Sequence, residues 1–160
     1  MDKWTESVIG NINQALEGTR EKDLRFFRID ELLRNIERVG KLSESCAECK
    51  RLKTEIETTI PNIREAIEVP GKKRRELDRL IARLARHIMK AHQFYPPWHH
   101  NYLYSFYGLV IGSAVGALTM ALLPGQKWEI LAAGFAIGLI TGQLIGGKKD
   151  REIRNNQKLM

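Results

Sequence analysis

Hydrophobic residues are concentrated in the last third of this 160-residue chain. Residues 102–123 carry no charged side chain, and residues 128–147 carry only Glu129. Each run is long enough to cross the apolar core of a bilayer as a helix, which needs about 20 residues. Residues 124–127 between them contain Pro and Gly and are too few for anything but a tight antiparallel connection. We therefore predict a hairpin of two transmembrane helices.

The chain before these runs repeats its apolar residues at helical spacing. A short amphipathic helix is expected within residues 1–17, ended by Gly18. A long helix is expected over about residues 22–59, with a kink or restart at Pro61. A further helix is expected over about residues 72–94, and no segment has the pattern of a strand. The residues expected on the inward face of that helix are Leu77, Leu80, Ile81, Leu84, Ile88 and Ala91.

A seven-residue rhythm runs through the second half of the long helix and beyond it. Its a and d positions are apolar except at Lys53, which favours coiled-coil packing. They are Val39, Leu42, Cys46, Cys49, Lys53, Ile56, Ile60, Ile63 and Ile67. The predicted fold is all-α: a cytoplasmic helical bundle or coiled coil, followed by the two-helix transmembrane hairpin.

Charge sets the expected topology. Basic residues flank both outer ends of the hairpin, so both termini are expected on the cytoplasmic side of a bacterial inner membrane. The predicted parts are a cytoplasmic bundle (1–95), an interfacial linker (96–101), the first transmembrane helix (102–123), an outer turn (124–127), the second transmembrane helix (128–147) and a basic cytoplasmic tail (148–160).

Glycine recurs at every fourth position of both predicted spans, which places a smooth stripe on one face of each helix and lets backbones approach closely. The stripes are Gly108, Gly112 and Gly116 in the first span and Gly134, Gly138, Gly142 and Gly146 in the second. They resemble the glycine zippers of small oligomeric membrane proteins. Either both stripes pack the hairpin against itself, or one packs the hairpin and the other packs a neighbouring copy.

The net charge of +7 is distributed unevenly, with −2 in residues 1–71, +6 in residues 72–90 and +3 in residues 148–160. Eight basic residues and two acidic residues lie within residues 72–90. Five of the basic side chains share one helix face: Arg75, Arg79, Arg83, Arg86 and Lys90. A solvated face is the simplest interpretation, and the functional alternatives are contacts with phosphates of anionic lipids or of RNA.

The ionisable residues of the hairpin lie at its ends. The spans hold no charged residue or histidine near the midplane, which argues against proton pumps and ion-coupled transporters. Lys127, Trp128 and Glu129 lie at the outer end, where they would surround the outer mouth of any pore.

Cys46 and Cys49 form half of a zinc-site pattern, and His87 and His92 are residues that would complete it. Both cysteines also occupy the heptad positions, where a small apolar side chain belongs. The pattern therefore favours core packing, with zinc binding and redox chemistry as alternatives. We therefore predict no metal and no cofactor.

The segment from Arg86 to His92 resembles the R-x4–6-H signature of HEPN domains, which are helical bundles. In active members the arginine stabilises a scissile RNA phosphate and the histidine transfers a proton without a metal. The resemblance implies these catalytic roles for Arg86 and His92, with His87 at the polar position after the arginine.

A HEPN-like motif in a helical bundle with a membrane anchor resembles the accessory membrane proteins of type VI, RNA-targeting CRISPR systems. This resemblance implies a homo-oligomeric inner-membrane pore that depolarises the cell during phage infection, with an inactive, divergent HEPN-like domain. Since two helices cannot enclose an aqueous path, a pore requires a ring of copies.

The expected partners are therefore other copies of the chain, anionic lipids, and RNA or an RNA-guided nuclease, with no small-molecule substrate. Two alternatives remain open at the level of sequence. One is a membrane-anchored ribonuclease that uses Arg86 and His92. The other is a non-conducting membrane scaffold that recruits a soluble partner.

Overall fold

The computed structural model describes residues 2–122 and 127–160, and within these ranges it contains helices and no named strand. This confirms the predicted all-α class. The chain divides into two compact units, Met1–Phe94 with Met160, and Tyr95–Leu159. Each unit is described by itself below.

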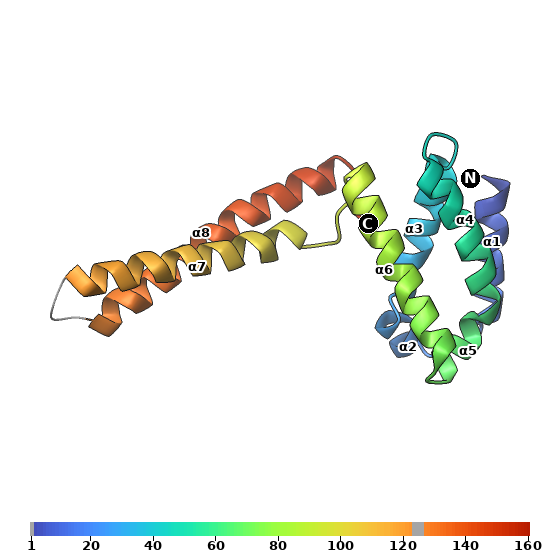
Figure 1. Cartoon of the computed structure of the whole chain (residues 1–160), viewed down its shortest axis with the longest axis horizontal. Coiled ribbons are helices and arrows are strands. Elements are labelled where there is room, and N and C mark those ends of the chain that lie inside the picture. Colours follow the sequence, from blue (N-terminus) through green and yellow to red (C-terminus); the bar gives the residue numbers. More distant parts are fainter. Residues whose placement is uncertain (1, 123–126) are drawn as a thin grey trace. The chain divides into compact units, whose positions relative to one another are not determined.

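The first unit is a bundle of helices (Figure 1). Its elements are α1 (Lys3–Ala15), α2 (Glu21–Phe26), α3 (Ile29–Leu42), α4 (Ala47–Thr59), the 3₁₀ turn η1 (Ile60–Asn62), α5 (Ile63–Glu68) and α6 (Lys72–His92). As expected, α1 ends just before Gly18, which has a positive φ of 78°. The expected change at Pro61 also occurs: this proline lies in η1, where the helical path changes direction between α4 and α5.

The predicted long helix over residues 22–59 is wrong, because the structure divides it into α2, α3 and α4. The first break is at Arg28, whose left-handed φ of 56° interrupts the helix between α2 and α3. The second break follows α3, where the hydroxyls of Ser43 and Ser45 bond to the carbonyls of Gly40 and Leu42 at 2.8 and 3.3 Å. Serine side chains that bond to nearby backbone compete with helix continuation.

The core of this unit is formed by aliphatic side chains from all its long helices. Helix α6 packs against α3, α4 and α5, and its predicted inward face is buried up to Ile88, whereas Ala91 is exposed. The side chains with almost no exposed surface include Ile12, Leu32, Ile36, Leu52, Ile56, Ile63, Leu77, Leu80, Leu84 and Ile88. Burial of an aliphatic side chain of this size stabilises a fold by about 1.5–3 kcal/mol.

Two glycines of the bundle differ in the room around them and give a paired prediction. A Cβ on Gly40 of α3 would overlap the Thr5 hydroxyl of α1, whereas a Cβ on Gly10 of α1 would have nothing within 4 Å. Gly40→Ala is expected to destabilise the bundle by about 1–3 kcal/mol through overpacking. Gly10→Ala is expected to stabilise it by up to about 1 kcal/mol, because alanine favours helix.

Urea denaturation of the two variants and of the parent chain in detergent micelles, followed by circular dichroism, measures both effects. Equal shifts of the same sign would show that α1 does not pack on α3 at Thr5.

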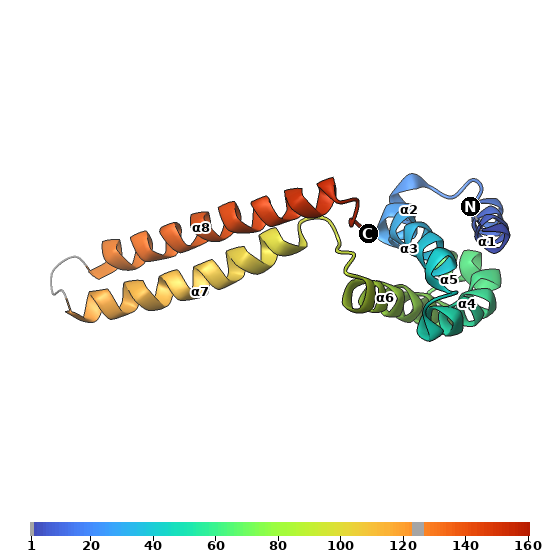
Figure 2. The ribbon, with the colours of Figure 1, turned by 90° about the horizontal axis from the view of Figure 1, so that it is seen from above.

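The second unit is a pair of long helices, α7 (His99–Leu122) and α8 (Lys127–Asn155), which lie side by side along their length in Figures 1 and 2. Both are long and apolar enough to cross a membrane by length and composition. Helix α7 begins before the first predicted span, and α8 continues beyond the second predicted span into the basic tail. Of the predicted outer turn, residues 124–126 lie outside the described residues, and Lys127 begins α8.

Candidate functional site

The glycine stripes of α7 and α8 face each other. A Cβ on Gly134 would lie 2.6 Å from the carbonyl oxygen of Gly112, and a Cβ on Gly138 would overlap the carbonyl oxygen of Gly108. In the other direction, Cβ atoms on Gly108 and Gly112 would overlap the carbonyl oxygens of Gly138 and Gly134. Because the atoms in the way belong to the backbone, no side-chain movement would make room.

The remaining stripe glycines also contact the opposite helix. A Cβ on each would meet backbone of the partner: Gly116 against Leu131, Gly142 against Tyr104 and Ser105, and Gly146 against His100 and Asn101. Both stripes therefore contact the opposite helix within the hairpin, whereas packing on a neighbouring copy stays a prediction.

The outward surface of the hairpin is apolar. Its exposed side chains include Val110, Ile111, Val115, Leu118, Phe135, Ile137, Ile140 and Leu144. Polar side chains are few in the described spans, and the hydroxyls of Thr119 and Thr141 bond to the carbonyls of Val115 and Ile137 in their own helices. A hairpin of this kind matches lipid tails on its outside and offers no continuous polar face among its described residues.

Asp150 of α8 holds the first turn of α7. Its carboxylate accepts hydrogen bonds from the backbone N–H groups of His100 and Asn101 at 3.1 and 2.9 Å, and His100 Nδ1 lies 3.3 Å from it. The Asp150 and His100 side chains are both buried. A carboxylate at a helix N-terminus satisfies free N–H groups and interacts favourably with the helix dipole. This contact was not predicted from the sequence, since the acid lies within a basic tail far from its partners.

The outer end of the hairpin is described in part. Lys127 begins α8, and Trp128 and Glu129 follow it in the first turn, both exposed. Two helices cannot enclose an aqueous path, so the outer-mouth role of these three residues stays a prediction.

The first unit contains a cluster of two thiols and two imidazoles, here called the Cys2His2 cluster: Cys46, Cys49, His87 and His92. One potential ligand atom from each residue lies within 4.8 Å of all the others. Cys46 precedes α4 as its N-cap and Cys49 lies in its first turn. His87 lies near the end of α6 and His92 is its last residue, so the cluster joins the start of α4 to the end of α6.

The contacts in the cluster converge on Cys49. Its Sγ lies 3.3 Å from His87 Nε2 and 3.4 Å from His92 Nε2, and Cys46 Sγ lies 3.4 Å from His87 Nε2. Residues five apart on a helix point about 140° away from each other. The two imidazole centroids are nevertheless only 5.2 Å apart, because both rings turn toward the first turn of α4.

The two thiols have opposite pKa shifts. Burial, reinforced by the Cys46 side chain, raises the pKa of Cys49 to about 12. The backbone N–H of Cys49 donates to Cys46 Sγ at 3.5 Å, and this hydrogen bond lowers the pKa of the Cys46 thiol. Burial and the neighbouring His92 lower the pKa of His87, which favours the neutral imidazole.

These positions refine the interpretation of the cysteines as core residues. Cys49 is fully buried, as a heptad position requires, but Cys46 is half-buried and caps a helix rather than lying inside one. The sequence contained the signal for the cluster, in the C-x2-C and H-x4-H spacings, but could not show that the two pairs meet.

The residues of the HEPN-like motif lie in different surroundings. His87 and His92 lie against the thiols, whereas Arg86 is exposed and makes no hydrogen bond or ion pair with the residues that the structure describes. The joint action of Arg86 and His92 on a phosphate, which the resemblance implies, would therefore require His92 to leave Cys49.

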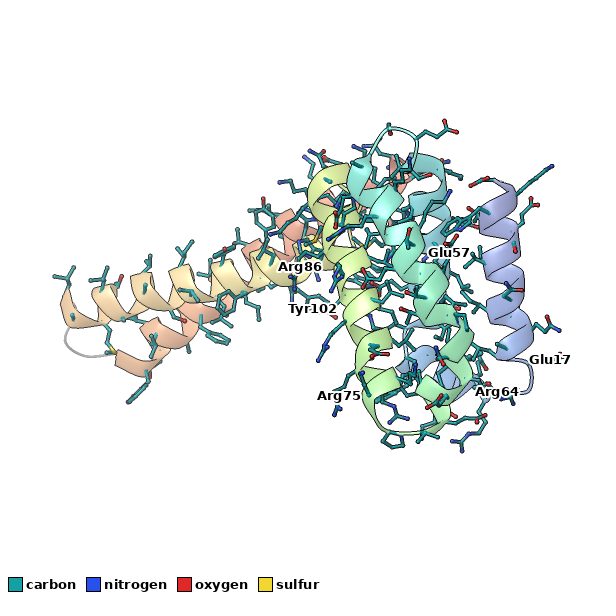
Figure 3. All side chains as sticks on the ribbon, turned by 45° about the vertical axis from the view of Figure 1, so that its right-hand side comes forward. Glu17, Glu57, Arg64, Arg75, Arg86 and Tyr102 are labelled. Atoms are coloured by element: carbon teal, nitrogen blue, oxygen red, sulfur yellow. The ribbon has the colours of Figure 1, made fainter. Side chains whose placement is uncertain are left out.

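The basic stripe of α6 is on the surface. Arg75, Arg79, Arg83, Arg86 and Lys90 are all exposed, and Figure 3 shows Arg75 and Arg86 projecting outward from the helix. Arg83 donates to Glu55 of α4 at 2.6 Å, so its charge is partly neutralised. The other four positive charges are available to an anionic partner.

Comparison of this chain with protein-family models, with curated proteins and with solved structures finds no match.

Proposed function

We propose that this chain is a non-conducting membrane anchor that holds a helical domain next to the cytoplasmic face of a bacterial inner membrane. The observation that carries this proposal is the closed glycine interface between α7 and α8. A hairpin whose stripe glycines all contact the opposite helix, and whose outer face is apolar, is soluble in lipid as a single unit.

In this proposal, the basic stripe of α6 binds the phosphates of anionic lipids. Only six residues separate the end of α6 from the start of α7 along the chain. A basic residue near an anionic bilayer contributes about 1 kcal/mol to binding. Four available charges are enough for an attraction of several kcal/mol that salt weakens.

Chemical footprinting of arginine tests this binding. The full chain is placed in liposomes of phosphatidylcholine, with or without phosphatidylglycerol, and treated with phenylglyoxal. We expect Arg75, Arg79 and Arg86 to react several-fold more slowly in the anionic liposomes, and high salt to remove the difference. Arg51 of α4, which is exposed and paired with Glu48, is the control. Equal rates for the stripe in both liposomes would show that it does not bind headgroups.

An oligomeric pore, with the antiviral role and the RNA-guided nuclease partner that the resemblance implies, is the second candidate. A groove of about 400 Å³ on the hairpin favours it, since Gly112 and Gly138 line this groove together with Ile111 and Ile137. A helix of a second copy is the occupant that such an apolar groove with small residues would accept.

Release of a dye from liposomes separates the two candidates. The anchor leaves liposomes sealed at every ratio of protein to lipid, whereas a ring of copies releases the dye above a threshold ratio. A known pore-forming peptide serves as the positive control for release. Release of the dye by the chain itself would contradict the anchor and support the pore.

A further inference from the structure

We propose that Cys46, Cys49, His87 and His92 bind one Zn²⁺ ion, which fastens the start of α4 to the end of α6. This inference is independent of the function proposed for the hairpin. It depends on the Cys2His2 cluster, in which side chains from two segments about 40 residues apart converge on one point.

The distances fit a tetrahedral zinc site. Zinc bonds of about 2.3 Å to sulfur and about 2.1 Å to nitrogen place sulfur and nitrogen ligands about 3.6 Å apart around a tetrahedral ion. Three of the four sulfur–nitrogen distances of the cluster are 3.3, 3.4 and 3.4 Å, and all four ligand atoms lie within 4.8 Å of one another. The cluster therefore needs only small side-chain adjustments to hold the ion.

Hydrogen bonds alone account poorly for the same contacts. A thiol has one hydrogen to donate, and one imidazole nitrogen can either donate or accept. Cys49 Sγ faces two imidazoles, and His87 Nε2 faces two thiols. A cation bound at the centre of the four ligand atoms satisfies every one of them at once.

The donor set selects the metal. Two thiolates and two imidazoles suit Zn²⁺, whereas Ca²⁺ and Mg²⁺ prefer oxygen and iron–sulfur clusters are usually held by four cysteines. The spacings C-x2-C and H-x4-H both fall within the ranges typical of structural zinc sites. Four protein ligands leave no position for water or substrate, which indicates a structural and not a catalytic ion.

The local structure also favours a metal-bound thiolate at Cys46. This residue is the N-cap of α4, where the helix dipole stabilises negative charge. The N–H of Cys49 already points at Cys46 Sγ, as it would to a thiolate ligand. The bound ion would join two helices that otherwise meet through the core and through the Arg83–Glu55 ion pair.

Metal analysis of the full chain tests the proposal. After purification in detergent with stoichiometric Zn²⁺ and removal of excess metal, we expect about one zinc per chain. Cys49→Ser and His92→Asn should each lose most of it, whereas His99→Asn, which removes a histidine outside the cluster, should retain it. A chain that retains no zinc, or that loses none in the two cluster variants, would overturn the proposal.

Cobalt spectroscopy keeps the test independent of whether the variants fold. Co²⁺ added to the metal-free parent chain should give the intense visible bands of a tetrahedral site and a thiolate charge-transfer band, and Zn²⁺ should abolish both. Weak bands of an octahedral ion would contradict the site. A disulfide between Cys46 and Cys49 in freshly isolated protein, detected by mass, would also contradict it, since it removes both thiolates.

Discussion

Gly138→Leu is expected to separate α7 from α8 and to destabilise the hairpin by roughly 3 kcal/mol. The added side chain has no space, because even a Cβ at this position overlaps the carbonyl oxygen of Gly108 and lies 2.9 Å from the Gly112 Cα. These obstacles are backbone atoms, so the two helices must move apart. They would lose the close contact made possible by the glycine stripes along the middle of the hairpin.

Energy transfer between the ends of the hairpin measures this effect. In a background with Trp4→Phe and Trp128→Phe, Trp98 is the only remaining tryptophan donor, and a dansyl group at the C-terminus is the acceptor. Titration with SDS should open the Gly138→Leu hairpin at a lower SDS fraction than the parent. Ala136→Leu, which adds the same kind of bulk to an exposed position of α8, should leave the midpoint unchanged. Equal behaviour of the two variants would contradict the packing of the stripes.

Asp150→Ala is expected to have a comparable effect where α8 contacts the first turn of α7. The substitution removes a carboxylate that accepts two backbone hydrogen bonds, and it leaves the N–H groups of His100 and Asn101 without their acceptor. Hydrogen bonds to a charged group contribute about 1.5–3 kcal/mol, so we expect a loss of about 3 kcal/mol.

The same energy-transfer titration measures this loss, with two companion variants. Glu152→Ala removes an exposed acid of the same helix and should have no effect, which controls for charge. Asp150→Asn retains one acceptor oxygen and should lose roughly half as much as Asp150→Ala. If Asp150→Ala and Glu152→Ala have the same midpoint, the carboxylate does not hold α7.

The periodic parts of the chain could be predicted from its sequence. The hairpin, the inward face of α6 up to Ile88 and the ends of α1 and η1 follow from apolar spacing, Gly18 and Pro61. These are local signals, because each depends on residues within a few turns of one helix.

The break of the long helix could not be predicted from apolar spacing. The heptad pattern continues across Ser43 and Ser45, although their hydroxyls end α3 by bonding to its last carbonyls. Apolar periodicity records which residues are buried and does not record where the backbone turns between them. Serine spacing was the signal that would have shown the break.

The sites depend on contacts between distant residues, which spacing does not determine. The sequence contains both halves of the Cys2His2 cluster, but only the packing of α4 on α6 brings Cys49 to His87 and His92. The same limit applies to the glycine stripes. Their positions could be predicted from the sequence, but the residues that they contact could not. The Asp150 contact had no signal, because a single acid in a basic tail has many equally plausible partners.

In the proposed function, the hairpin closes on itself and needs no second copy. Counting of subunits tests this most directly: the full chain, fused to one fluorescent protein, is observed as single spots in dilute supported bilayers. We expect nearly all spots to bleach in one step. Spots that bleach in several steps, at a protein density too low for chance overlap, would contradict it and would favour a ring of copies.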